Sequence, residues 1–339
     1  MNKKKKIKGG VIGLGTGLHQ ARILSSYNYS DLVTICDFEK NKLSEVQSEF
    51  VNVRKTEDDK DILLDKNIDL VCIASYDEFH HKQIISSLNN GKHVYVEKPI
   101  CLYLKDLKNI YEELKKFPNL NISSNMVLRT CPLFKKVREA IMSKKLGDVY
   151  HIEADYLWGR KEKIISGWRS KTKYYSIIHG AAVHMIDLVL WLTGKKPVSV
   201  KALGSNIIVS GTNQKHNDFS ILLLEFEDKM SIKISAHGGG VHPHFHSLKI
   251  FGSKKTFIHD YGKTIWINSN NQNQNFINED APYPAKENRN QALISFINHL
   301  INPTNKVLVP REDIFDSMCI CFAAEESMKT GNSVPIKYF

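Results

Sequence analysis

The feature that most constrains the fold is an alternation of short apolar runs with helical segments in the first third of the chain. The apolar runs are typical of buried strands and cover Ile7–Ile12, Leu32–Cys36, Asp69–Ala74 and His93–Val96. The helical patterns cover the segment from Gly17 to about Ser26, Lys40–Phe50, Phe79–Asn89 and Lys105–Lys116. Strands that are separated by helices pair in parallel through right-handed crossovers. We therefore predict a doubly wound parallel α/β sheet in residues 1–123.

The pattern changes after about residue 123. Helical patterns and then a series of strand candidates cover Phe134–Ser143, Ala181–Leu192, Val198–Leu203, Phe219–Glu227, Lys229–Ala236, Ser247–Phe251, Thr256–His259 and Thr264–Asn268. Consecutive strands that are joined by Gly, Asn and Asp predict a large, mostly antiparallel sheet. An Asn/Gln-rich loop is expected over Asn268–Asn275, before closing helices over Asn288–Asn302 and Arg311–Thr330. Because 339 residues favour two domains, we predict that residues 124–339 form a separate α+β domain.

Composition excludes several classes of protein. The net charge is +11, and part of it lies in an expected solvated tail, Lys3–Lys6 and Lys8, whose following glycines leave no apolar signal segment. The remaining positive charge is dispersed, whereas nucleic-acid binding needs a localised basic surface. No apolar run approaches the roughly 20 residues that cross a bilayer. The six cysteines form no C-x-x-C pair, so we expect buried thiols in a cytoplasmic protein that binds neither nucleic acid nor a membrane.

A glycine-rich turn separates the first strand from the first helix. It contains Gly13, Gly15, Thr16 and Gly17. Gly13 permits a tight turn, Gly15 lets the backbone approach a pyrophosphate, and the helix N-terminus supplies N–H groups and a positive dipole. The third glycine arrives one residue earlier than in G-x-G-x-x-G, so glycines that only form a turn remain an alternative.

Asp37 lies at the end of the second strand, about twenty residues beyond the glycine turn. A carboxylate at this place binds both ribose hydroxyls of an adenosine, and its charge repels a 2′-phosphate. Phe38 follows where an NADP enzyme often has Arg or Ser. We therefore predict NAD, rather than NADP, as the cofactor. The alternative role of Asp37 is to cap the helix that begins near Glu39.

Two longer strings extend this pattern. They are Ala74-Ser-Tyr-Asp-Glu-Phe-His80 and Gly91-Lys-His-Val-Tyr-Val-Glu97-Lys98-Pro99. Together with the glycine turn, they resemble the Gfo/Idh/MocA oxidoreductases, the family of glucose–fructose oxidoreductase and inositol dehydrogenase. The resemblance continues through Asn125–Arg129, Gly147–Asp148, Trp168–Arg169, His184–Asp187 and Ser327–Gly331, so that it spans nearly the whole chain.

The resemblance implies a Rossmann domain that binds NAD(P) and a second domain whose open sheet builds homodimers or homotetramers. It also implies oxidation or reduction of a secondary alcohol on a sugar, cyclitol or nucleotide-sugar. Besides the glycine turn and Asp37, the implied cofactor-binding positions are Ser75, His80, Glu97, Lys98, Trp168 and Arg169. The E-K-P lysine of the family falls on Lys98, near the nicotinamide and the reacting oxygen. The family's D-x-x-x-H motif falls on Gly180 to His184, where the histidine matches and the aspartate is absent.

Loss of hydride from a secondary alcohol requires that the hydroxyl proton leaves as the carbonyl forms. A neutral imidazole at His184 is suited to take that proton, and the ammonium of Lys98 can bind the developing oxyanion. Without the motif, His184 would read as a core histidine on an apolar helix. His179 is a candidate substitute for the missing aspartate, and Asp187 is another. Asp187, on the same helix face as His184, is a candidate substrate contact or a structural residue.

A histidine-rich segment, His237–His246, is the most unusual stretch of the chain. His242, His244 and His246 would share one face of a strand and could then hold zinc. Pro243 and the three preceding glycines favour a loop or a bulged edge instead, and the nicotinamide chemistry needs no metal. We therefore predict no metal site. We expect His242 and His244 to contact the substrate, with a loop or oligomer interface as the alternative.

Tyr174 is a further candidate substrate contact, because Tyr174 and Tyr175 precede the helix that carries His184. A solvated loop is its alternative.

Three functions remain open at this point. The first is an NAD-dependent sugar dehydrogenase or reductase, the second is an NAD-dependent glycosidase that oxidises its sugar transiently, and the third is an NAD-binding regulatory protein without catalysis. Gly180 is the best support for the third, whereas Lys98 and His184 argue against it.

Overall fold

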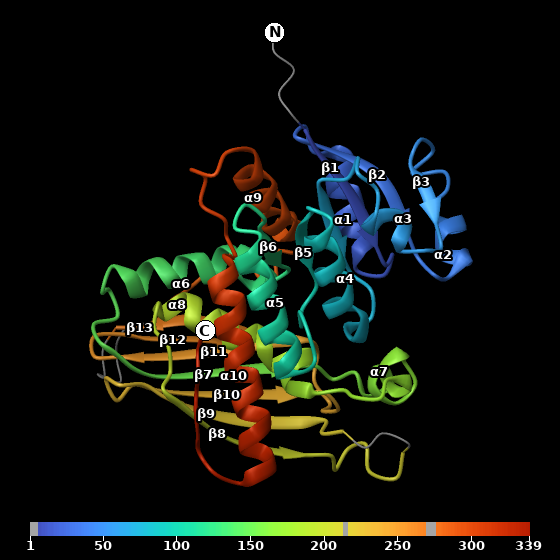
Figure 1. The fold of residues 1–339 in the computed structure, drawn as a ribbon. Helices are drawn as coiled ribbons and strands as arrows, with labels where there is room; N and C mark the ends of the chain where they lie inside the picture. Colours follow the sequence, from blue (N-terminus) through green and yellow to red (C-terminus); the bar gives the residue numbers. More distant parts are fainter. Residues whose placement is uncertain (1–5, 213–215, 269–275) are drawn as a thin grey trace. The chain divides into compact units, whose positions relative to one another are not determined.

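The computed structural model describes residues 6–212, 216–268 and 276–339 (Figure 1). The chain forms two compact units. The first runs to Val127 and includes Glu287–Ile314, and the second comprises Leu128–Lys286 and Phe315–Phe339. Within the described ranges, no helix is both long and apolar enough to span a membrane. The predicted tail residues Lys3, Lys4 and Lys5, and most of the predicted Asn/Gln-rich loop, lie outside the described residues.

The first unit contains a six-stranded parallel sheet, which confirms the doubly wound fold. Its strands are β1 (Ile7–Ile12), β2 (Ser30–Cys36), β3 (Arg54–Thr56), β4 (Leu70–Ile73), β5 (His93–Val96) and β6 (Ile122–Ser124), in the order β3-β2-β1-β4-β5-β6. Its helices are α1 (Gly17–Ser26), α2 (Lys40–Glu45), α3 (Lys60–Leu63), α4 (Asp77–Asn89), α5 (Leu104–Lys116) and α9 (Asn290–Ile301). The order reverses between β1 and β4, so the loops after these strands flank the topological switch point.

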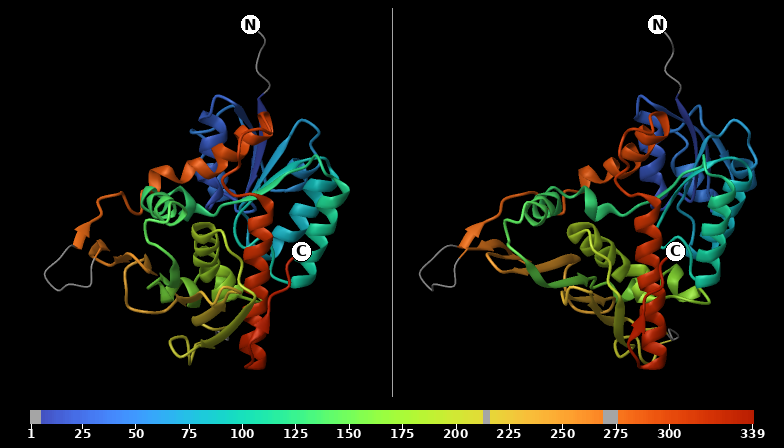
Figure 2. Two further views of the ribbon diagram at one scale, coloured as in Figure 1. Left: turned by 90° about the vertical axis from the view of Figure 1, so that its left-hand side faces the viewer. Right: turned by 60° about the vertical axis from the view of Figure 1, so that its left-hand side comes forward.

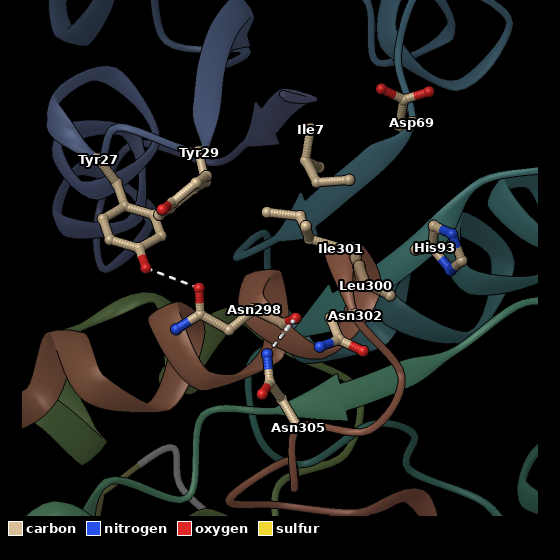
Figure 3. Close-up of a pocket in the computed structure, with 10 residues that line it drawn as sticks. All are labelled: Ile7, Tyr27, Tyr29, Asp69, His93, Asn298, Leu300, Ile301, Asn302 and Asn305. Atoms are coloured by element: carbon tan, nitrogen blue, oxygen red, sulfur yellow. Dashed lines mark hydrogen bonds between the residues drawn. The ribbon is translucent and has the colours of Figure 1, made fainter. Parts of the chain in front are cut away.

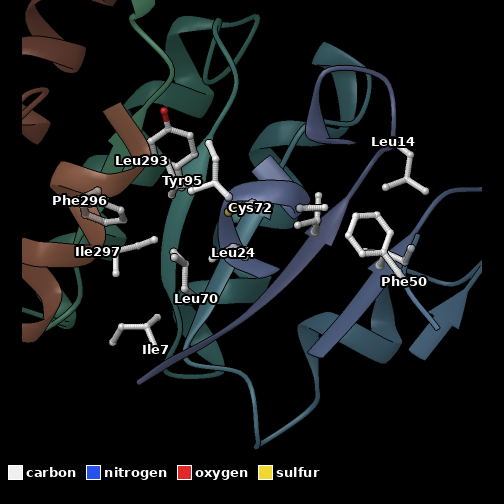
Figure 4. Close-up of a cluster of buried hydrophobic side chains, with 14 of the residues drawn as sticks. Ile7, Leu14, Leu24, Phe50, Leu70, Cys72, Tyr95, Leu293, Phe296 and Ile297 are labelled. Carbon is white, nitrogen blue, oxygen red and sulfur yellow. The ribbon is translucent and has the colours of Figure 1, made fainter. Parts of the chain in front are cut away.

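The core of this unit includes a helix from far along the chain. Figure 4 shows Leu293, Phe296 and Ile297 of α9 in one cluster with Leu70 and Tyr95 of the parallel sheet. The rings of Tyr95 and Phe296 are 6.1 Å apart between centroids. Burial of such side chains contributes about 1.5–3 kcal/mol each relative to exposure. The helix at 290–301 therefore completes the core of the nucleotide-binding unit.

The second unit is built on a nine-stranded, mostly antiparallel sheet, as the sequence predicts. Its strands are β7 (Val149–Leu157), β8 (Ser199–Ser205), β9 (Phe219–Glu225), β10 (Ser231–His237), β11 (Phe245–Gly252), β12 (Thr256–Asp260), β13 (Lys263–Ile267), β14 (Phe276–Asn278) and β15 (Val334–Pro335), in the order β14-β13-β12-β11-β7-β10-β9-β8-β15. The pairing of β7 with β10 is parallel. The other described pairings in this sheet are antiparallel.

Helices cover one face of this sheet, as Figures 1 and 2 show for α6 (Pro132–Met142) and α8 (Val183–Thr193). A single π-helical turn, η3 (Ile178–Ala182), leads directly into α8. The remaining helices are α7 (Lys161–Ile165), the 3₁₀ turns η1 (Val127–Thr130), η2 (Trp168–Lys171) and η4 (Lys286–Arg289), and α10 (Arg311–Thr330). The Ser327 hydroxyl of α10 accepts a hydrogen bond from the Ala202 amide of β8 at 2.8 Å, which fixes this helix to the sheet.

Besides several short elements that were not predicted, two longer ones differ from the sequence prediction. The helix expected over Lys40–Phe50 ends at Glu45, and the chain then continues as turns that bury Val46 and Phe50. The strand β7 was not predicted at all, although it is central in the second sheet. Its burial alternates from Ile152 to Trp158, because every second side chain faces the helices. That period-2 pattern was the available signal.

Candidate active site

The glycine turn lies at the carboxyl end of β1, where ligands bind in open parallel sheets. Gly13 has φ of +91°, and a Cβ there would lie 2.3 Å from the carbonyl oxygen of Ala74, so only glycine fits. At Gly17, a Cβ would lie 2.9 Å from the Ala74 side chain. At Gly15, by contrast, a Cβ would meet no atom within 4 Å. Gly15 and Thr16 are exposed, so the backbone of this turn is open to a ligand.

Asp37 fixes the glycine turn to the end of β2. Its side chain is 3% exposed, and its Oδ2 accepts a hydrogen bond from the Leu14 amide at 2.7 Å. Its Oδ1 accepts from the Glu39 amide at 2.9 Å, while Glu39 itself is the N-cap of α2. A carboxylate has about four acceptor sites, so two engaged amides leave capacity for ribose hydroxyls. The open turn and this carboxylate fit the pyrophosphate and ribose of a dinucleotide.

Glu97 lies at the end of β5 in a hydrogen-bonded network. Its Oε1 accepts from Gln20 of α1 at 2.9 Å and from Asn125, beyond β6, at 2.6 Å. Asn125 in turn accepts from the hydroxyl of Tyr95 at 2.9 Å. Burial raises the pKa of Glu97 to about 6, against the opposing effects of these hydrogen bonds and of the Lys98 charge. The network connects the helix after the glycine turn to the ends of β5, which precedes Lys98, and of β6.

Lys98 follows Glu97 and is half-buried. The loop behind it is held by His80, which is fully buried in α4. The His80 ring lies between two carbonyl oxygens, with Nδ1 at 2.7 Å from Pro99 and Nε2 at 3.1 Å from Ser75. These contacts favour a role for His80 in positioning the loop that carries Lys98, rather than in direct contact with a cofactor.

His184 lies in the second unit, on α8, and is 9% exposed. Its ring is parallel to that of Tyr156 on β7, with the centroids 5.6 Å apart and 6° between the planes. Tyr156 also contacts His244 at 5.2 Å and His246 at 4.9 Å between centroids. The structure therefore brings part of the histidine-rich segment to the same aromatic cluster as the predicted base. Tyr156 was missed in the sequence because β7 was missed.

His242 and His246 do not share one strand face in the structure. β11 begins at Phe245, and the His242 ring contacts Tyr261 at 5.4 Å. The His246 Nδ1 lies 2.7 Å from the hydroxyl of Tyr283. Over the residues that the structure describes, no group of three or more His, Cys, Asp and Glu side chains has the geometry to hold a metal ion.

Arg169 is surrounded by aromatic rings. Its guanidinium lies 4.4 Å from the Trp168 ring centroid, 5.2 Å from that of Trp158 and 5.8 Å from that of Tyr175. Such cation–π contacts contribute about 0.5–2 kcal/mol each. Arg169 and Trp168 are both predicted cofactor contacts, and the buried Nε of Arg169 has no hydrogen-bond partner within the described part of the chain. We predict from this that its charge serves an anionic ligand.

The predicted helpers of His184 have other contacts. The His179 ring is 1% exposed, its Nδ1 lies 3.1 Å from the Ser176 hydroxyl, and it also approaches Glu325 of α10. Asp187 binds Arg129 through both oxygens, at 2.6 and 2.9 Å, and each side chain is 1% exposed. These contacts favour the structural alternative for Asp187. Tyr174 contacts the ring of His216 at 5.7 Å.

A cavity of about 700 Å³ lies elsewhere, at the amino ends of β1 and β5 (Figure 3). Its polar groups are engaged with protein atoms. The Tyr27 hydroxyl donates to Asn298 at 2.7 Å, and Asp69 accepts from the Lys8 amide at 2.9 Å. Ligands of parallel sheets bind at the opposite, carboxyl ends. We therefore assign no role to this cavity.

A parallel sheet with an open glycine turn and a buried carboxylate at its switch point defines a dinucleotide-binding enzyme of the Rossmann class. Two family models match the chain: the oxidoreductase family with an NAD-binding Rossmann fold over residues 7–123, and the GFO/IDH/MocA C-terminal domain over residues 134–258. The chain belongs to the Gfo/Idh/MocA family of NAD(P)-dependent oxidoreductases.

Known proteins of similar sequence and structure include inositol dehydrogenases. Myo-inositol 2-dehydrogenase of Thermotoga maritima is 24% identical over 263 residues, which is 74% of each chain. The structure of myo-inositol 2-dehydrogenase from Lactobacillus plantarum has a TM-score of 0.83 at 21% identity, covering 98% of this chain and all of that one. Scyllo-inositol dehydrogenase from Lactobacillus casei, solved with NAD(H) and scyllo-inositol, has a TM-score of 0.81 at 22% identity, covering 98% and 99%.

Proposed function

We propose that this protein is an NAD-dependent dehydrogenase or reductase that acts on a secondary alcohol of a cyclic polyol, sugar or nucleotide-sugar. The observation that carries the proposal is the cluster of His184, Tyr156, His244 and His246. It combines one buried imidazole, suited to proton transfer, with neighbouring phenol and imidazole groups that hydrogen-bond hydroxyls. The relatives named as inositol dehydrogenases support a polyhydroxylated ring as the substrate class.

The chemistry divides between the two units. When bound, NAD would supply the hydride acceptor for the carbon that bears the hydroxyl. In the proposal, His184 removes the hydroxyl proton and the ammonium of Lys98 binds the oxygen on which negative charge develops. Glu97 and Asn125 keep the strand end before Lys98 in place. The proposal requires that Lys98 and His184 meet at one substrate, and that Trp168 and Arg169 contact the cofactor.

Asp37 supports NAD over NADP. The carboxylate is buried and lies against the backbone of the glycine turn, so a 2′-phosphate at this place would face a negative charge. Lys42, whose Nζ is 3.7 Å from Asp37 Oδ2, is also 2.8 Å from Glu39 Oε1. Two acidic groups therefore contact this ammonium. This arrangement disfavours the additional phosphate of NADP.

The test is a spectrophotometric assay with a set of alcohols. The protein is mixed with NAD⁺ and separately with myo-inositol, scyllo-inositol, glucose and UDP-glucose, and NADH formation is followed. The proposal expects NADH with at least one of the polyols or sugars and a loss of that signal in Lys98→Met. Release of phenol from aryl glycosides without net NADH would instead support the transient-oxidation glycosidase. NADH binding without any turnover would support the regulatory alternative.

We also propose self-association through the second sheet. The face of this sheet away from α6 and α8 exposes Leu203 and Leu223, each at least half exposed. Large exposed apolar side chains on one sheet are typical of protein interfaces. Sedimentation of the wild type should give a dimer or tetramer, and replacement of Leu203 and Leu223 by Lys should give monomers.

A further inference from the structure

In the structure, another side chain fills the space beside the position where the D-x-x-x-H motif has its aspartate. Gly180 lies in the π turn before α8, and its backbone is not in the left-handed region. A side chain at 180 is therefore not excluded by the backbone. A Cβ there would instead lie 2.7 Å from the hydroxyl oxygen of Tyr175 and 3.0 and 3.1 Å from its ring carbons Cε2 and Cζ. The end of the Tyr175 ring occupies the space that a side chain at 180 would fill.

Tyr175 is held firmly in this position. Its side chain is 4% exposed, and its ring lies 5.8 Å from the guanidinium of Arg169. The next residue, Ser176, forms a short hydrogen bond with Glu325 of α10 and accepts hydrogen bonds from the amides of Ile178 and His179. The segment that leads into η3 is therefore anchored on both sides of the tyrosine. Gly180 is partly exposed, so the place where ring and helix meet is accessible to a ligand.

The position of this hydroxyl relates it to His184. Gly180 precedes His184 by four residues, which is about one turn across the junction of η3 with α8. A group beside Gly180 is therefore one turn from the predicted base, where the motif of the family places a carboxylate. π-helical turns occur frequently at functional sites. A phenol differs from a carboxylate because it can donate a hydrogen bond as well as accept one.

We propose that Tyr175 is a positioning residue of the reaction, whose hydroxyl takes the place of the motif carboxylate beside His184. It hydrogen-bonds the imidazole or the substrate hydroxyl and so orients the proton transfer, and no covalent bond to the tyrosine forms. The inference rests on the proposed dehydrogenase function. The proposal also explains the glycine, because any side chain at position 180 would collide with the Tyr175 ring.

The kinetic test uses NAD⁺ with whichever of myo-inositol and scyllo-inositol the wild type oxidises. Tyr175→Phe keeps the ring and removes only the hydroxyl, so kcat should fall about 10- to 100-fold with little change in the KM for NAD⁺. Tyr111→Phe, the same change on α5 of the first unit, is the control and should match the wild type. The double variant Tyr175→Leu/Gly180→Asp rebuilds the family motif and should recover most of the lost kcat. Full activity of Tyr175→Phe would overturn the proposal.

A second arm tests the contact without turnover. Gly180→Ala should lower the thermal unfolding temperature of the wild type, because the new methyl group collides with the tyrosine hydroxyl. In a Tyr175→Leu background the same change should have no destabilising effect, since the far end of the ring is gone. An equal loss of unfolding temperature in both backgrounds would refute the contact between Tyr175 and position 180. If no alcohol yields NADH, the proposed function fails, and the positioning role of Tyr175 fails with it. The unfolding temperatures of these variants still test whether the Tyr175 ring contacts position 180.

Discussion

Replacement of Asp187 by Ala is expected to destabilise the second unit strongly while sparing the chemistry. The carboxylate binds Arg129 in a two-pronged arrangement at 2.6 and 2.9 Å, and both side chains are 1% exposed. Removal of one partner leaves a buried guanidinium without its counter-charge, which costs about 3–5 kcal/mol. Each kcal/mol corresponds to about 2–4 °C for a unit of this size, so the unfolding temperature should fall by about 6–20 °C.

Thermal unfolding, combined with an activity assay well below the transition, separates a structural role from substrate contact. The double variant Arg129→Met/Asp187→Leu replaces the ion pair by apolar side chains of similar size, and it should be much more stable than Asp187→Ala. Activity of the folded Asp187→Ala protein should remain within a few-fold of the wild type. A variant with wild-type stability and no activity would refute this reasoning and place Asp187 in the substrate site.

Three further predictions concern the first unit. Lys98→Met should lower kcat by about 10²–10³-fold, because it removes a donor to the developing oxyanion, while NADH binding measured by fluorescence stays near the wild-type level. Asp37→Ser should raise the kcat/KM for NADP⁺ relative to NAD⁺, since the negative charge at the ribose is removed; an unchanged ratio would contradict the assignment of Asp37. Folding raises the pKa of Glu97 from 4.5 to about 6, so the folded state favours the protonated acid. The contribution of this group to the free energy of unfolding is therefore full below pH 4.5 and is lost as the pH rises through about 6. The change is about 2 kcal/mol. Glu97→Gln should flatten the denaturant-unfolding stability over this range, and an equally steep profile in the variant would exclude Glu97 as the source.

The sequence was most informative where one local pattern determines the structure. Continuous apolar runs predicted β5 at His93–Val96 without error, because a strand buried on both faces needs no partner information. The helix α10 was also placed at its observed bounds, Arg311–Thr330. The strand β7 was missed because its polar side chains, such as Glu153 and Asp155, alternate with buried ones and resemble a loop when read singly.

The contacts of the site were less predictable, because they depend on which strands become neighbours. The stacking of Tyr156 on His184 and its contact with His244 bring together β7, α8 and the segment before β11. No spacing along the chain encodes that meeting. The burial of His179 against Glu325 was likewise hidden, since it follows from the docking of α10. The sequence identified the chemically capable side chains, and the packing decides which of them face one another.

The same distinction governs how the glycines are interpreted. Gly13 is required by its backbone, whose φ is +91°, whereas Gly180 lies in the π turn without a positive φ, and the tyrosine ring beside it leaves no room for a side chain. From the motif alone, the glycine at 180 reads as a lost catalytic group and favours a protein that only binds NAD. In the structure the same glycine accommodates a phenol hydroxyl one turn from His184. With the proposed positioning role of Tyr175, the departure from the motif becomes a substitution of one polar group by another, and it would then no longer argue for the non-catalytic alternative.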